Sequence, residues 1–145
     1  MDIREIEKGD LLALLDLYTH LHEDSVPTVD EALDGLWRGI LADRNHHIVA
    51  GFEDGVMVSS CMIVVVPNLT RGMRPYALIE NVVTRAEYRN RGYATAILDY
   101  AKQIAEGENC YKIMLMTGSK SEATLRFYEK AGYNKQDKTA FIQWL

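Results

Sequence analysis

Residues 89–95 combine basic side chains with a glycine where a strand-like segment gives way to a helix-like one. The start of a helix offers unpaired backbone N–H groups and the positive end of the helix dipole, which together bind phosphate. A glycine lets the backbone approach such a ligand closely, because it has no Cβ atom. The pattern indicates a phosphate site made by Arg89, Asn90, Arg91, Gly92, Tyr93, Ala94 and Thr95. Basic residues that are only solvated are the alternative.

One acidic residue lies where a general base could act. Glu80 follows Ile79 in an apolar, strand-like run. A carboxyl group among apolar neighbours has a raised pKa, and it can then accept a proton near neutral pH. A place on the solvent face of the strand, or beside a nearby arginine, is the alternative for Glu80. His46 and His47 are rival bases, because histidine titrates near neutrality, although the start of a strand favours their exposure.

Two sequence blocks together resemble one family. The spacing Arg89-x-x-Gly92-x-Ala94 resembles the pyrophosphate loop of the GNAT superfamily of acyl-CoA-dependent N-acyltransferases, Gln/Arg-x-x-Gly-x-Gly/Ala. The block LRFYEKAGY, residues 125–133, resembles the late helix of that family. The blocks occur in the family's order, with a strand-like segment between them. The joint match covers residues 78–133 and is specific, whereas either block alone would not be.

The resemblance implies roles for residues outside the loop. It makes Tyr128 the general acid that protonates the departing CoA thiolate, whereas the residue type alone favours core packing. It also implies a bulge after Glu80, with the backbone of Val82, Val83 and Thr84 binding the pantetheine arm. An N–H group of Val82 or Val83 would then polarise the thioester carbonyl. Ser121 replaces an asparagine that commonly opens the late helix, and a serine can cap the helix and still bind the cofactor.

These residues favour an N-acetyltransferase that uses acetyl-CoA as acyl donor and needs no metal. We expect a primary amine to attack directly in a ternary complex, since no Ser-His-Asp or Cys-His arrangement suggests a covalent intermediate. A small-molecule amine is the favoured acceptor. The alternatives are a protein N-terminus or lysine, or a catalytically silent CoA-binding regulatory module, which would need neither Glu80 nor Tyr128. Candidate acceptor contacts are His20, His22, Glu23, Asp24, Trp37 and Arg71.

Length and composition set the broad class. A chain of 145 residues suits one acetyltransferase domain over residues 1–145, and its net charge of −5 argues against a nucleic-acid partner. No apolar run reaches the roughly 20 residues of a membrane helix. Cys61 and Cys110 have no metal or redox spacing, which favours reduced thiols and a cytoplasmic location. Homodimers are common among the relatives, so one is possible here.

The expected fold is α+β, a single-domain GNAT-like fold whose mixed, mostly antiparallel twisted sheet has helices on both faces. Hydrophobic periodicity predicts helices after Asp10, from Thr28, after Ala94 and over residues 122–131. Asp10 is expected to cap the first helix, and Thr28 and Glu31 to form a capping box. Strands are expected over residues 2–7, 46–52, 56–66, 78–84, 111–117 and 139–145, with a hairpin turn at Asp54-Gly55.

Overall fold

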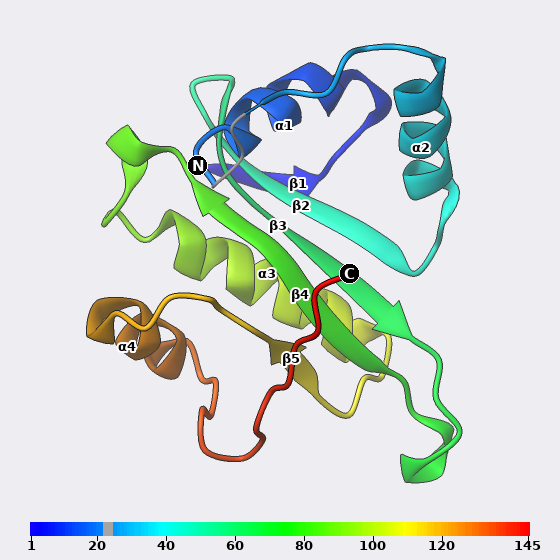
Figure 1. Cartoon of the computed structure of the whole chain (residues 1–145), viewed down its shortest axis with the longest axis vertical. Helices are drawn as coiled ribbons and strands as arrows, with labels where there is room; N and C mark the ends of the chain where they lie inside the picture. The colour runs from blue at the N-terminus through cyan, green and yellow to red at the C-terminus, as the bar shows by residue number, and fades with distance from the viewer. Residues whose placement is uncertain (22–24) are drawn as a thin grey trace. The chain divides into compact units, whose positions relative to one another are not determined.

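The computed structural model describes residues 1–21 and 25–145 (Figure 1). Within it the chain forms two compact units, Met1–Met114 and Leu115–Leu145. The first unit holds almost the whole sheet and three α-helices, and the second holds α4 (Glu122–Lys130) and the segment after it. The expectation of a single domain over residues 1–145 stays a prediction.

Five strands form one sheet in the order of the sequence. These are β1 (Asp2–Glu5), β2 (His46–Glu53), β3 (Val56–Val66), β4 (Tyr76–Thr84) and β5 (Ile113–Leu115). The first four pair antiparallel with their neighbours. The β2–β3 turn is the expected hairpin, because Asp54 and Gly55 both have positive φ, 49° and 79°, as a tight hairpin turn requires.

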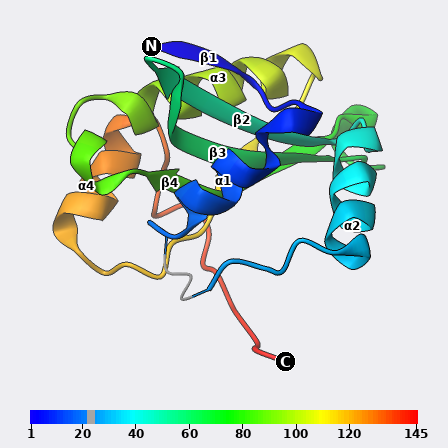
Figure 2. The same cartoon turned by 90° about the horizontal axis from the view of Figure 1, so that it is seen from above.

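Helices cover both faces of this sheet, which confirms the expected α+β fold. In Figure 2, α3 (Tyr93–Gly107) lies on one side, and α1 (Leu11–Tyr18) and α2 (Glu31–Ala42) lie on the other. The buried residues of α3 are Ile97, Leu98, Ala101 and Ala105, the spacing of one helical face. Their burial holds α3 on the sheet, and the start of this helix is thereby fixed relative to β4.

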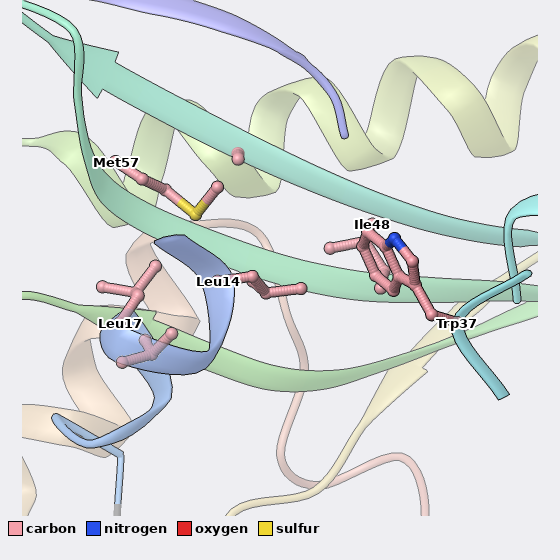
Figure 3. Close-up of a cluster of buried hydrophobic side chains, with 7 residues drawn as sticks. Leu14, Leu17, Trp37, Ile48 and Met57 are labelled. Atoms are coloured by element: carbon pink, nitrogen blue, oxygen red, sulfur yellow. The ribbon is translucent and has the colours of Figure 1, made fainter. Parts of the chain in front are cut away.

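The hydrophobic core on the opposite face joins both helices to the sheet (Figure 3). Its fully buried members are Leu14, Leu17, Trp37, Ile48, Ala50, Met57 and Val83. The indole Nε1 of Trp37 donates to the carbonyl oxygen of Lys8 at 3.1 Å, so the one polar atom of that side chain is satisfied. A fully buried leucine contributes about 1.5–3 kcal/mol. This cluster therefore anchors α1 on β3 and β4, near Val83, and anchors α2 on β2.

Three sequence expectations about local structure are wrong. Helix α2 begins at Glu31 rather than Thr28, because the Asp30 carboxylate caps it, accepting from the Leu33 N–H at 3.0 Å. The carboxylate of Asp10 does not cap α1, since it binds Arg4 at 2.7 Å and the Glu7 N–H at 2.6 Å. The third concerns residues 139–145, which form no strand in the described structure. Alternating apolar residues make a strand only where another strand pairs with them.

Candidate active site

A β-bulge interrupts β4 directly after Glu80. Glu80 lies opposite Met62 of β3 and Val83 lies opposite Ser60, so two residues of β4 oppose the single Cys61. The first of the two, Asn81, has a φ of 56°. This left-handed conformation is uncommon in a strand, and asparagine is among the few residues other than glycine that adopt it readily. The structure thus contains the irregularity that the family resemblance implies.

The bulge brings Glu80 and Val83 to the same face of the sheet. Side chains alternate along a regular strand, so residues three apart would point to opposite faces. Val83 belongs to the cluster beneath α1 and α2, and Met62, the partner of Glu80, packs against the same cluster. The extra residue of the bulge shifts the alternation by one position, so Glu80 and Val83 point to the same face. The Glu80 carboxylate therefore lies on the face of the sheet that α1 and α2 cover. Only Asn81 separates Glu80 from Val82 along the chain.

Glu80 is exposed, and this corrects the expectation of apolar surroundings. Ile79 and Val83 of the same strand are buried, but each is buried by packing of its own side chain into the core. The carboxylate faces open space instead. A basic group of a bound molecule can reach it there.

One edge of β4 is open near these residues. The Ala77 N–H donates to the carbonyl oxygen of Lys112 at 3.0 Å, and the Tyr111 N–H donates to that of Pro75 at 2.9 Å. These bonds align β5 with the beginning of β4. Because β5 has three residues and β4 has nine, β5 runs beside only the first part of β4. The described part of β5 therefore does not reach Val82, Val83 and Thr84.

The segment after β4 forms an open turn that ends at the start of α3. A short 3-10 turn, Ala86–Tyr88, precedes Asn90 and Gly92, whose φ angles are 61° and 84°. A Cβ atom at Gly92 would meet no other atom within 4 Å, so space is open beside this backbone. Helix α3 begins at Tyr93, and the N–H groups of its first turn have no partner within the helix. This arrangement can hold a diphosphate.

Side chains around the turn fix it to neighbouring elements. The guanidinium of Arg89 donates to the carbonyl oxygens of Thr84 at 3.2 Å and His20 at 3.1 Å. The Arg91 guanidinium lies over the Tyr88 ring, 5.3 Å from its centroid. Partial burial and the nearby Glu53 carboxylate raise the pKa of Tyr93. In this conformation the Arg89 side chain stabilises the turn. The backbone N–H groups, rather than this guanidinium group, are then available to a ligand.

Tyr128 and Ser121 belong to the second unit and are placed within it. Tyr128 is half-buried on α4, in edge contact with the rings of Phe127 and Tyr133 at 5.0 and 6.3 Å between centroids. Ser121 is the exposed N-cap residue of α4, but its side chain makes no capping hydrogen bond. The expected side-chain cap is therefore absent at Ser121, which leaves its hydroxyl group on the surface.

The two histidines that could rival Glu80 lie two strands away from it. His47 pairs with Ile63, which pairs with Ile79, and this row points to the face opposite Glu80. Its Nδ1 is 2.5 Å from a carboxylate oxygen of Glu5. Partial burial lowers the pKa of His46. Neither histidine therefore lies beside the bulge, where Glu80 lies.

The residues expected to contact an acceptor fall into different surroundings. Trp37 is a core residue, 4% exposed, so it offers no surface to a ligand. His20 accepts the Ala86 N–H through Nδ1 at 3.3 Å, and the Arg71 guanidinium lies 5.7 Å from the centroid of the Tyr111 ring. His22, Glu23 and Asp24 lie outside the described residues. One residue that sequence reasoning missed is Asn81, whose type, poor in strands but tolerant of positive φ, was the available signal.

Comparison with known proteins agrees with this geometry. The family model described as "Acetyltransferase (GNAT) family" matches residues 11–133. The chain belongs to the GNAT family. This GNAT chain is therefore an acetyl-CoA-dependent N-acetyltransferase, and the resemblance drawn from residues 78–133 is confirmed.

Three relatives of this GNAT protein span nearly its whole length. A putative acetyltransferase from Agrobacterium tumefaciens str. C58 has 40% sequence identity and a TM-score of 0.92, over 100% of both chains. Glucosamine 6-phosphate N-acetyltransferase from Trypanosoma brucei brucei is 29% identical over 144 residues, 95% of this chain and 92% of that protein. The enzyme of that name from Arabidopsis thaliana has 20% identity and a TM-score of 0.85, over 99% and 97% of the two chains, which shows a shared fold.

Other features of the GNAT chain concern metals, membranes and thiols. Across residues 1–21 and 25–145, no group of three or more His, Cys, Asp or Glu side chains could hold a metal ion. Within the same ranges, no helix has the length and apolar character needed to cross a bilayer. Cys61 and Cys110 are free thiols, and burial raises the pKa of Cys61 to about 12. The cytoplasmic location stays a prediction.

Proposed function

We propose that this GNAT enzyme transfers the acetyl group of acetyl-CoA to the primary amine of a small molecule, by direct attack in a ternary complex. The observation that carries the proposal is the bulge in β4. It sets an exposed carboxylate beside two backbone N–H groups, and the same strand leads into an anion-binding turn at the start of α3. A general base, an oxyanion site and a diphosphate site are thus contributed by one continuous segment.

The proposed chemistry gives each group one task. The amine nitrogen forms a bond to the acetyl carbon as the bond from that carbon to sulfur breaks. Glu80 takes a proton from the ammonium group of the acceptor, directly or through water, so that the neutral amine can attack. The nitrogen loses a second proton to water as the amide forms. An N–H group of Val82 or Val83 donates to the acetyl oxygen as negative charge develops there. Tyr128 supplies the proton that the departing thiolate takes up, and Ser121 contributes a cofactor contact.

The cofactor is bound chiefly by the backbone in this proposal. The diphosphate accepts hydrogen bonds from N–H groups of residues 90–95, where the open space beside Gly92 admits it. Val82, Val83 and Thr84 pair with the pantetheine arm along the part of β4 that β5 does not cover. Arg91 and the positive end of α3 stabilise the negative charge, whereas Arg89 shapes the turn through the carbonyl groups it binds.

The acceptor is assigned by chemical class, with one specific compound to test first. The T. brucei relative is a glucosamine 6-phosphate N-acetyltransferase, and its identity of 29% extends over nearly the whole chain. We infer that the acceptor of this protein is an amino sugar phosphate. Its amine would be protonated in water, so a base such as Glu80 is required before it can attack. An amine of a protein, at its N-terminus or on a lysine, remains the alternative acceptor.

A thiol-release assay tests the function. The purified chain is mixed with acetyl-CoA and one amine from a panel of glucosamine 6-phosphate, an aminoglycoside, a polyamine and a lysine peptide. We expect release with a small amine and none with the peptide. Release with the peptide alone would make the protein acceptor correct. CoA binding by calorimetry, with no thiol release from any amine of the panel, would mean that the acceptor belongs to another class.

A homodimer is also proposed, on the basis of residues 139–145. Phe141, Ile142 and Trp144 are 91%, 69% and 86% exposed, and contiguous apolar surface of this kind marks an interaction site. The sequence TAFIQWL has strand character but forms no strand with the rest of the described chain. The short strand β5 ends the sheet, so its free edge can accept a strand from a second copy. Reciprocal exchange of this segment would close a two-fold dimer.

A further inference from the structure

The short 3-10 turn that leads from β4 to the start of α3 is bonded at both ends to one residue. Its first N–H group, that of Ala86, donates to Nδ1 of His20 at 3.3 Å. Its C-cap residue, Arg89, donates through its guanidinium group to the carbonyl oxygen of His20 at 3.1 Å. His20 lies two residues beyond the end of α1, and it precedes these partners by 66 and 69 residues. The contacts therefore join two segments that are distant in the sequence.

His20 is itself fixed in place by its surroundings. It is half-buried, and its own N–H group donates to the carbonyl oxygen of Leu17 at 3.0 Å. Just before the turn, the Arg85 guanidinium donates to the carbonyl oxygen of Met57 at 2.8 Å and to the carboxylate of Asp16. This ion pair holds the end of α1 beside β3, so the His20 ring is presented to the turn from a fixed position.

The Ala86 N–H group needs an acceptor from outside the turn. The first N–H group of a helical turn has no partner within it. A backbone N–H group can only donate, so Nδ1 of His20 accepts and carries no hydrogen in this arrangement. Asn90 follows Arg89 directly and has a φ of 61°. The position of the 3-10 turn thus determines where the backbone of residues 90–95 begins.

We propose that His20 is a positioning residue for the cofactor, which holds the 3-10 turn so that the N–H groups of residues 90–95 face the diphosphate. The inference rests on the proposed function for its effect on acetyl-CoA binding, and on the geometry alone for its effect on the turn. It replaces the expectation that His20 contacts the acceptor, because the Nδ1 atom and the carbonyl oxygen of His20 are both bonded to the turn.

The expected effect is that of one hydrogen bond on the preorganisation of a binding site. Without the imidazole ring, the Ala86 N–H group binds water and the turn gains other conformations. A ligand that must first order its site binds less tightly than one that meets a formed site. Loss of one hydrogen bond changes an equilibrium constant by about 3- to 10-fold. Turnover at saturating acetyl-CoA should change little, because β3 and β4 form the bulge beside Glu80 without His20.

The first test replaces His20 by leucine, which has no acceptor atom. We expect His20→Leu to raise the dissociation constant of CoA by about 3- to 10-fold in calorimetry, with kcat changed by less than about twofold. Thr19→Val is the matched control, because it removes a hydroxyl group at the same end of α1 that bonds to the carbonyl oxygen of Asp16 at 2.7 Å. Unchanged affinity in His20→Leu, or an equal loss in Thr19→Val, would overturn the proposal.

A second variant restores the acceptor alone. The side-chain carbonyl oxygen of asparagine branches from the same carbon position as Nδ1 of histidine, and it can accept the Ala86 N–H group. We expect His20→Asn to bind CoA within about twofold of the wild type. An asparagine variant as weak as the leucine variant would contradict the proposed role. So would a raised KM for the amine in both variants with an unchanged dissociation constant for CoA, since that result would make His20 an acceptor contact.

Hydrogen exchange separates this inference from the proposed function, because it needs neither CoA nor an amine. The Ala86 amide should exchange faster in His20→Leu than in the wild type, His20→Asn or Thr19→Val. Unchanged exchange in His20→Leu would remove the positioning role and leave the proposed acetyl transfer intact. A wild type that neither binds CoA nor releases thiol would defeat the proposed function, whereas the exchange of Ala86 would still decide whether His20 holds the turn.

Discussion

At the scale of single residues, Glu80 carries the clearest prediction. Glu80→Gln keeps the size of the side chain but removes the group that accepts a proton, so kcat should fall by about 10²–10⁴-fold. Thiol release measured across pH checks this. Because Glu80 is exposed and faces no core residue, the melting temperature should stay close to that of the wild type. Full activity of Glu80→Gln at every pH would assign the base elsewhere.

Tyr128 can be tested in the same way, as the proposed proton donor to the departing thiolate. Tyr128→Phe keeps the ring contacts with Phe127 and Tyr133 and removes the proposed proton donor. We expect a lower kcat with little change in the dissociation constant of acetyl-CoA, measured by calorimetry. Tyr100→Phe on α3 is a control for loss of a half-buried tyrosine hydroxyl. A large loss of affinity with intact kcat would make Tyr128 a binding residue instead.

At the scale of elements, the turn before α3 depends on one backbone conformation. Gly92 has a φ of 84°, and a β-branched side chain there is strained even though space is open around it. A cost of about 1–2 kcal/mol corresponds to roughly tenfold weaker binding of CoA if it distorts the turn. Gly92→Val should show this by calorimetry, and Gly107→Val at the other end of α3 should not. Equal affinity in both variants would argue against the diphosphate site.

The sequence predicted an element correctly where the residues that determine it are close together along the chain. The strands β2 and β3, the turn between them, and α3 were predictable because each follows from local periodicity and turn residues. The start of α2 was misplaced because Thr28 and Asp30 are both good capping residues, and only the observed bond to Leu33 distinguishes them. The exposure of Glu80 and the contacts of Arg89 with carbonyl oxygens depend on distant residues, which no local pattern records.

At the scale of the whole molecule, residues 139–145 predict an assembly. The wild type should sediment as a dimer, because Phe141 and Trp144 are apolar side chains that the described chain leaves exposed. Replacing both by serine should give a monomer in analytical ultracentrifugation, whereas Gln143→Ser, which changes a polar neighbour, should not. A wild type that stays monomeric at high concentration would contradict the exchange of this segment.

The bulge at Asn81 makes the length of β4 part of the proposed catalytic apparatus. Without that one residue the strand would alternate regularly against β3, with Glu80 and Val83 still on one face and an unbroken ladder between the strands. The chain keeps a less regular sheet, and in the proposed mechanism this irregularity turns the backbone N–H groups beside Glu80 toward the acetyl group. Deletion of the single Asn81 codon would therefore favour a straighter strand, whereas selection for turnover would favour keeping it.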